Sequence, residues 1–66
     1  MIERVIVLSD KRDPNVCSIA IARFDHSGQA ADGSVPTILC RVPTELANEI
    51  GTLIARWRGR EFVPRR

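Results

Sequence analysis

One segment of the chain has a clear helical period, and it limits the folds that the remaining residues can form. Five apolar side chains recur along it at intervals of three and four residues, which places them on one side of a helix: Leu46, Ile50, Leu53, Ile54 and Trp57. Pro43 suits the first helical position, and Gly59 is a typical helix stop. The pattern therefore predicts one amphipathic helix that begins at Pro43 and ends at Gly59.

Gly51 stands in the middle of this helix, where glycine costs about 0.5–1 kcal/mol relative to alanine. Its use there is explained if another segment of the chain approaches the helix closely at this point.

Three earlier segments have the composition of β-strands. Residues 2–8 and 16–24 are rich in Ile, Val and Ala, and residues 37–42 alternate between the two sides. A polar turn at 9–15 and a longer loop at 25–36 with two glycines and a proline separate them. The β-β-β-α order predicts an α+β fold: a small three-stranded antiparallel sheet with one C-terminal amphipathic helix packed on one face.

The length of 66 residues allows a single domain, 1–66, whose last segment, 60–66, is a short basic tail. A domain this small buries only about 60% of the surface of its unfolded chain, so its core is thin. No apolar run reaches the ~20 residues of a membrane-spanning helix, and residues 1–8 lack the features of a signal peptide. We expect a cytoplasmic protein.

One helix can cover one face of such a sheet and leaves the other face open. The strand alternation places one set of residues toward the helix: Cys17, Ile19, Ile21, Ile38, Cys40 and Val42, with Ile6 and Leu8. A second set lies on the reverse face: Val5, Val7, Val16, Ala20, Ala22, Phe24 and Leu39. An apolar patch of this kind usually marks an interface.

We therefore predict a homodimer that packs sheet to sheet or through strand edges. Its predicted interface is the reverse face: Val5, Val7, Ala20, Ala22, Phe24 and Leu39. In the alternative, the tail folds back through Phe62 and Val63 and covers part of this face; these two residues either dock on the domain or form a short edge strand.

The charges are unevenly distributed. Residues 1–40 carry four basic and five acidic side chains, whereas residues 41–66 carry six and three. Arg56, Arg58 and Arg60 are interleaved with aromatic residues, a mixture found in nucleic-acid-binding proteins. Arginines at a helix end also complement the helix dipole, and Trp57 on the apolar stripe is typical of a core residue. We favour this second interpretation.

The sequence shows no pattern that demands catalysis, a metal or a cofactor. There is no glycine-rich phosphate loop and no Cys-x-x-Cys pair, and His26 is the single histidine. Asp25, His26 and Ser27 are adjacent, which is typical of a turn, whereas catalytic triads join distant positions. Cys17 and Cys40 share a predicted face, either as a reactive pair or, as we favour, as two small buried side chains.

Two functions fit these features. The first is a small non-enzymatic regulator or inhibitor that occupies the surface of a host or cellular protein, the kind of protein that phages and mobile elements use. Its expected contacts are Phe24, Leu39, Arg56, Arg58 and Arg60. The alternative is a small dimeric, antitoxin-like regulator that binds nucleic acid through the C-terminal arginines.

Overall fold

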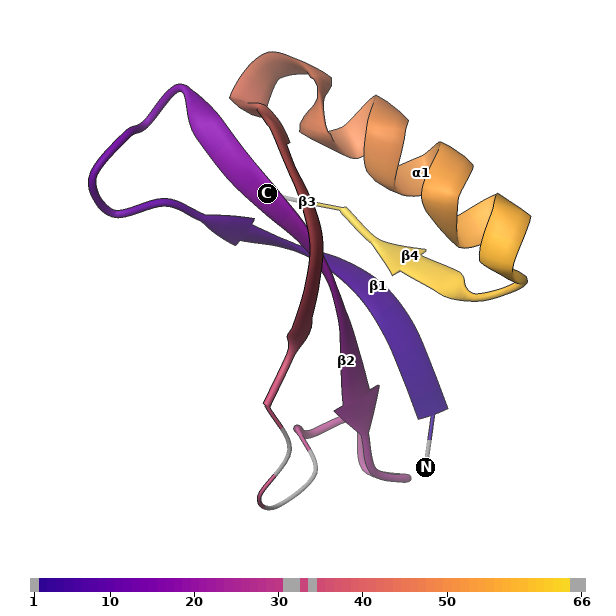
Figure 1. Cartoon of the computed structure of the whole chain (residues 1–66). Coiled ribbons are helices and arrows are strands. Elements are labelled where there is room, and N and C mark those ends of the chain that lie inside the picture. Colours follow the sequence, from indigo (N-terminus) through magenta and orange to yellow (C-terminus); the bar gives the residue numbers. More distant parts are fainter. Residues whose placement is uncertain (1, 31–32, 34, 65–66) are drawn as a thin grey trace.

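The computed structural model describes residues 2–30, 33 and 35–64, so parts of the predicted loop and tail lie outside the described residues. Its elements follow in the order β1 (Ile2–Ser9), β2 (Val16–Phe24), β3 (Thr37–Pro43), a 3-10 turn (Thr44–Leu46), α1 (Ala47–Arg58) and β4 (Glu61–Val63). The strands form one sheet in the order β3-β2-β1-β4, with α1 on one face (Figure 1). The α+β class with a C-terminal helix on one face of the sheet is confirmed.

The prediction of a three-stranded, purely antiparallel sheet is wrong in one detail. A fourth strand, β4, pairs with β1 and runs parallel to it. Gly59 adopts φ +67°, and the N–H of Arg60 donates to the carbonyl oxygen of Ala55 at 2.9 Å. This left-handed cap reverses the chain at the helix end and directs it back along β1. The described part of the tail therefore forms the short edge strand that was one of the two alternatives.

The helix turns a different side to the sheet from the one its large apolar residues predicted. Its buried residues are Ala47, Gly51 and Ala55, which lie one turn apart, while Leu53 and Trp57 are exposed. The 3-10 turn precedes it, so the α-helix begins at Ala47 and Pro43 ends β3. The assignment of the large apolar stripe to the core is thus wrong for Leu46, Leu53 and Trp57, which are exposed, whereas Ile50 and Ile54 do pack against the core.

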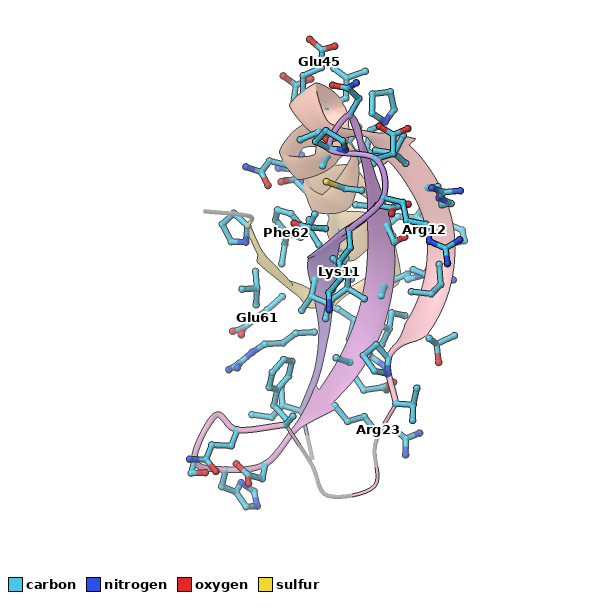
Figure 2. The ribbon with its side chains drawn as sticks, turned by 90° about the vertical axis from the view of Figure 1, so that its left-hand side faces the viewer. Lys11, Arg12, Arg23, Glu45, Glu61 and Phe62 are labelled. Carbon is cyan, nitrogen blue, oxygen red and sulfur yellow. The ribbon has the colours of Figure 1, made fainter. Side chains whose placement is uncertain are left out.

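The close approach of the helix to β4 explains why small residues face the sheet. A Cβ built on Gly51 would lie 2.6 Å from Cζ of Phe62, well inside van der Waals contact. Figure 2 shows Phe62 on the helix side of β4 and its neighbour Glu61 on the other side. Small residues on α1 let its backbone come near the sheet, and Phe62 fills the space that they leave.

The alternation predicted for β1 is inverted. Val5 pairs with Ile21 and Val7 pairs with Ile19, and cross-strand partners point to the same side of a sheet. Val5 is 0% exposed and belongs to the core beneath α1, against which Val7 packs. The placement of Val5 and Val7 on the open face is therefore wrong, and Ile6 and Leu8 lie there instead.

A β-bulge changes the alternation in β3. Ile19 pairs with Cys40, but the next residue, Ala20, pairs with Ile38, so that Leu39 is skipped. Ile38 consequently shares the face of Ala20, away from the helix, while Leu39 packs against the core. The sequence predicts each of them on the opposite side. Within the described residues, no helix has the length and apolarity needed to cross a membrane.

Candidate interaction surfaces

The side of the sheet away from α1 carries mostly apolar side chains. We call it the open sheet face, and its larger members are Ile2, Ile6, Leu8, Phe24, Ile38 and Val63. Ile38 is 52% exposed, Ile2 and Val63 are also exposed, and the others are half-buried. Ala20 and Ala22 lie on this face as predicted, but both are buried and contribute little surface.

Charged groups on the open sheet face are already paired. Arg4 donates from Nε to Oε2 of Glu61 at 3.0 Å, and its guanidinium lies 5.3 Å from the ring centroid of Phe24. Arg41 forms an ion pair with Asp10. A hydrogen bond from the backbone N–H of Arg12, assisted by Arg41, lowers the pKa of Asp10. The face is therefore apolar with locally neutralised charges.

A second apolar surface runs along the outer side of α1. We call it the helix seam; its members are Leu46, Leu53 and Trp57, which are exposed, and Ile50, which is half-buried and also packs against the core. Leu53 is 63% exposed and Trp57 83% exposed, and the guanidinium of Arg58 lies 5.9 Å from the Trp57 ring. The sequence contained a signal for this arrangement, since Ala47, Gly51 and Ala55 form a second stripe of helical period. The prediction from the sequence places only the larger residues in the core.

The structure does not bring the predicted partner-binding residues together. Phe24 lies on the open sheet face, whereas Leu39 packs on the helix side of the sheet. Arg60 is 3.5 Å from Glu3, so part of its charge is neutralised. Within the described residues, Arg56 and Arg58 are exposed and take part in no ion pair.

The loop and the cysteines make structural contacts. Ser27 Oγ donates to Oδ1 of Asp25 at 2.6 Å, and the N–H of Gln29 donates to the same oxygen. These hydrogen bonds, above all the one from the Ser27 hydroxyl, lower the pKa of Asp25.

Cys17 is buried with Sγ 3.3 Å from Oγ1 of Thr44, and Cys40 is half-buried; both are free thiols. Among the described side chains, no group of three or more His, Cys, Asp or Glu could hold a metal ion.

The total exposed surface is large for the mass of the chain. A monomer of 7.4 kDa is expected to expose about 4,200 Å², whereas this chain exposes 4980 Å². The excess of about 800 Å² belongs to the whole chain, and the exposed apolar side chains of the open sheet face and of the helix seam contribute to it. The two apolar surfaces are therefore candidates for burial against other molecules.

No family model, curated protein or solved structure matches the chain.

Proposed function

We propose that the chain is a small protein-binding regulator that acts by occupying the surface of a partner protein, with the open sheet face as its binding surface. The observation that carries the proposal is this contiguous apolar face, which no described segment of the chain covers. An antiparallel strand pair with a solvated face normally alternates apolar and polar residues, and here Ile6, Phe24 and Ile38 take positions where polar residues are expected.

The chemistry of the face defines the partner. Burying the exposed half of Ile2, Ile38 or Val63 contributes about 1 kcal/mol each, before association costs. Arg4 and Arg41 are neutralised by their own acidic neighbours, so they offer little attraction to an oppositely charged surface. The partner therefore presents an apolar patch, and binding depends only weakly on salt.

A capture experiment with matched variants tests this function. The immobilised wild-type chain is compared with Ile38→Lys, which places a charge on the open sheet face, and with Val35→Lys. Val35 is 82% exposed in the loop and lies outside both apolar surfaces, so it is the control. We expect a stoichiometric protein partner with the wild type and Val35→Lys, retained as salt is raised, and lost with Ile38→Lys. Circular dichroism verifies that each variant is folded.

Two results contradict the proposal. One is the recovery of no stoichiometric partner by the wild-type chain, and the other is equal recovery by Ile38→Lys.

A second candidate function, nucleic-acid binding, is favoured by the exposure of Trp57 next to Arg56 and Arg58. An exposed tryptophan beside unpaired arginines is suited to stacking on a base while the cations contact phosphates. Because Arg60 forms an ion pair with Glu3, only Arg56 and Arg58 of the C-terminal arginines remain unpaired within the described residues, and binding would be weak.

Titration with single-stranded and duplex oligonucleotides separates this function from protein binding. Binding at roughly 50 mM salt that quenches Trp57 fluorescence and falls steeply with salt supports it. The Arg56→Ala and Arg58→Ala double variant must then bind more weakly. No binding at that salt concentration removes nucleic acid as a ligand.

A further inference from the structure

The helix seam has the spacing of a helix–helix interface. Its members recur at intervals of four, three and four residues, which is the a/d pattern of a coiled coil. The helix packs on its own sheet through Ala47, Gly51 and Ala55, with Ile50 and Ile54 against the same core, so the exposed seam residues Leu46, Leu53 and Trp57 are not needed to hold it there. One helix thus has two apolar sides, and the described chain covers one of them.

The charges beside the seam define an orientation for a second helix. With Ile50 and Trp57 at position a of the heptad, Glu49 and Arg56 both fall at position g. In a parallel pair, g residues lie next to e residues of the other helix, but the e positions here, Ala47 and Ile54, pack on their own sheet. In an antiparallel pair, g residues face g residues, so opposite charges meet.

We propose that a second copy of this chain binds the helix seam, with the two α1 helices antiparallel. Two-fold symmetry then places Glu49 of each copy beside Arg56 of the other, so that the same ion pair forms twice. Trp57 of each copy packs near Leu46 of the other, at the two ends of the seam. The open sheet face stays free, so this dimer is compatible with the proposed function and does not depend on it.

This interface differs from the one that the sequence predicted. The predicted dimer uses the reverse sheet face; of its residues, Val5, Val7 and Leu39 lie in or against the core, while Ala20, Ala22 and Phe24 do lie on the open sheet face. The antiparallel seam instead uses Leu46, Leu53 and Trp57, which the structure leaves exposed. The antiparallel seam has, in addition, charges that match their own copy.

Sedimentation velocity over micromolar to millimolar concentrations tests the interface. We expect the wild-type chain to reach twice its 7.4 kDa mass as concentration rises. Leu53→Lys introduces a charge at the seam, twice per dimer, and is expected to weaken association by about tenfold or more. Ile38→Lys is the control, since Ile38 is similarly exposed but lies on the open sheet face.

Charge reversal tests the antiparallel orientation. Glu49→Arg and Arg56→Glu each replace two attractive pairs by two repulsive ones, and each is expected to weaken the dimer by about threefold to tenfold. The double variant, Glu49→Arg with Arg56→Glu, recreates the pairs in reverse and is expected to restore wild-type association. Glu49 and Arg56 are exposed, so replacing them leaves the core unchanged.

Several results overturn the proposal. They are a wild-type chain that stays monomeric throughout, a dimer that survives Leu53→Lys, a dimer lost only in Ile38→Lys, or a double charge variant that stays as weak as the single ones. If Leu53→Lys does not fold, the sedimentation of the wild-type chain decides whether the dimer forms. A mixture of isotope-labelled and unlabelled protein is expected to show intermolecular contacts between Leu46 methyls and the Trp57 indole, and a dimer without them contradicts the seam.

Discussion

Gly51 offers a quantitative test of how the helix sits on the sheet. At an exposed helical position, replacing glycine by alanine stabilises a protein by about 0.5–1 kcal/mol. Here the new Cβ would lie 2.6 Å from Cζ and 3.1 Å from Cδ1 of Phe62, whose ring packs against the core. Overpacking of this kind costs about 1–3 kcal/mol. We expect Gly51→Ala to lower the free energy of unfolding by about 1–2 kcal/mol, whereas the same substitution at an exposed helical position raises it.

Urea unfolding followed by far-ultraviolet circular dichroism measures this change. Protein concentration is held constant, because association would stabilise the folded state. A loss of 1 kcal/mol corresponds to a Tm lower by about 4–8 °C in a domain of this size. Thr52→Ala, at the neighbouring exposed position, is the control and is expected to change the free energy of unfolding by less than about 0.5 kcal/mol.

A double-mutant cycle with Phe62→Leu shows whether the ring is the cause. The smaller side chain alone destabilises the protein, but it also makes room for a Cβ at position 51. The cost of Gly51→Ala should therefore fall by about 1 kcal/mol or more in the Phe62→Leu background. The reasoning is refuted if Gly51→Ala is as stable as the wild type, or if its effect is the same in both backgrounds.

Two further predictions concern side chains outside the interfaces. The pKa of Asp25 is below its ordinary value of 3.8 because Ser27 and the loop backbone donate hydrogen bonds to the carboxylate; these bonds stabilise the loop at higher pH and are lost as pH falls through the lowered pKa. Carbon-detected NMR titration should give a midpoint below 3.8 that rises in Ser27→Ala, and an unchanged midpoint contradicts this role. Cys40, which is half-buried, should react with a thiol reagent faster than Cys17, which is buried beside Thr44; equal rates in Cys17→Ser and Cys40→Ser would contradict the burial described for them.

The elements that could be predicted from the sequence are those that local chemistry specifies. Three β-rich segments separated by polar turns predicted the first three strands, and Gly59 predicted the helix end because a left-handed cap favours glycine. Gly51 predicted a close approach to the helix, which the Phe62 contact confirms.

The faces of β1 and β3 could not be read from alternation. Val5, Ile6, Val7 and Leu8 are all apolar, so no polar residue defines which side of the strand meets the helix. The pairing of Val5 with Ile21 decides it, and this pairing is a property of the register of the whole hairpin. In β3, the bulge between two paired positions shifts the alternation by one residue, and no glycine in the strand signals it.

The strand β4 was beyond the reach of sequence periodicity for a different reason. Glu61–Val63 spans three residues, which is too short to show a period, and its parallel pairing with β1 requires the chain to reverse at Gly59. Two ion pairs, Arg4–Glu61 and Arg60–Glu3, then join β4 and the residue before it to β1. They connect residues far apart in the sequence, so sequence periodicity does not predict them.

The helix separates the residues that fold the chain from those available for association. Burying a leucine fully is worth about 1.5–3 kcal/mol, so a domain with a thin core gains by turning its largest apolar side chains inward. Here Ala47, Gly51 and Ala55 are turned inward with Ile50 and Ile54 packed beside them, while Leu53 and Trp57 are exposed. Because an exposed side chain contributes little to folding, truncating Leu53 should leave the free energy of unfolding of the monomer nearly unchanged. A surface of large apolar residues that does not serve the monomer's stability, and whose flanking charges match an antiparallel copy of itself, is better explained by association than by folding.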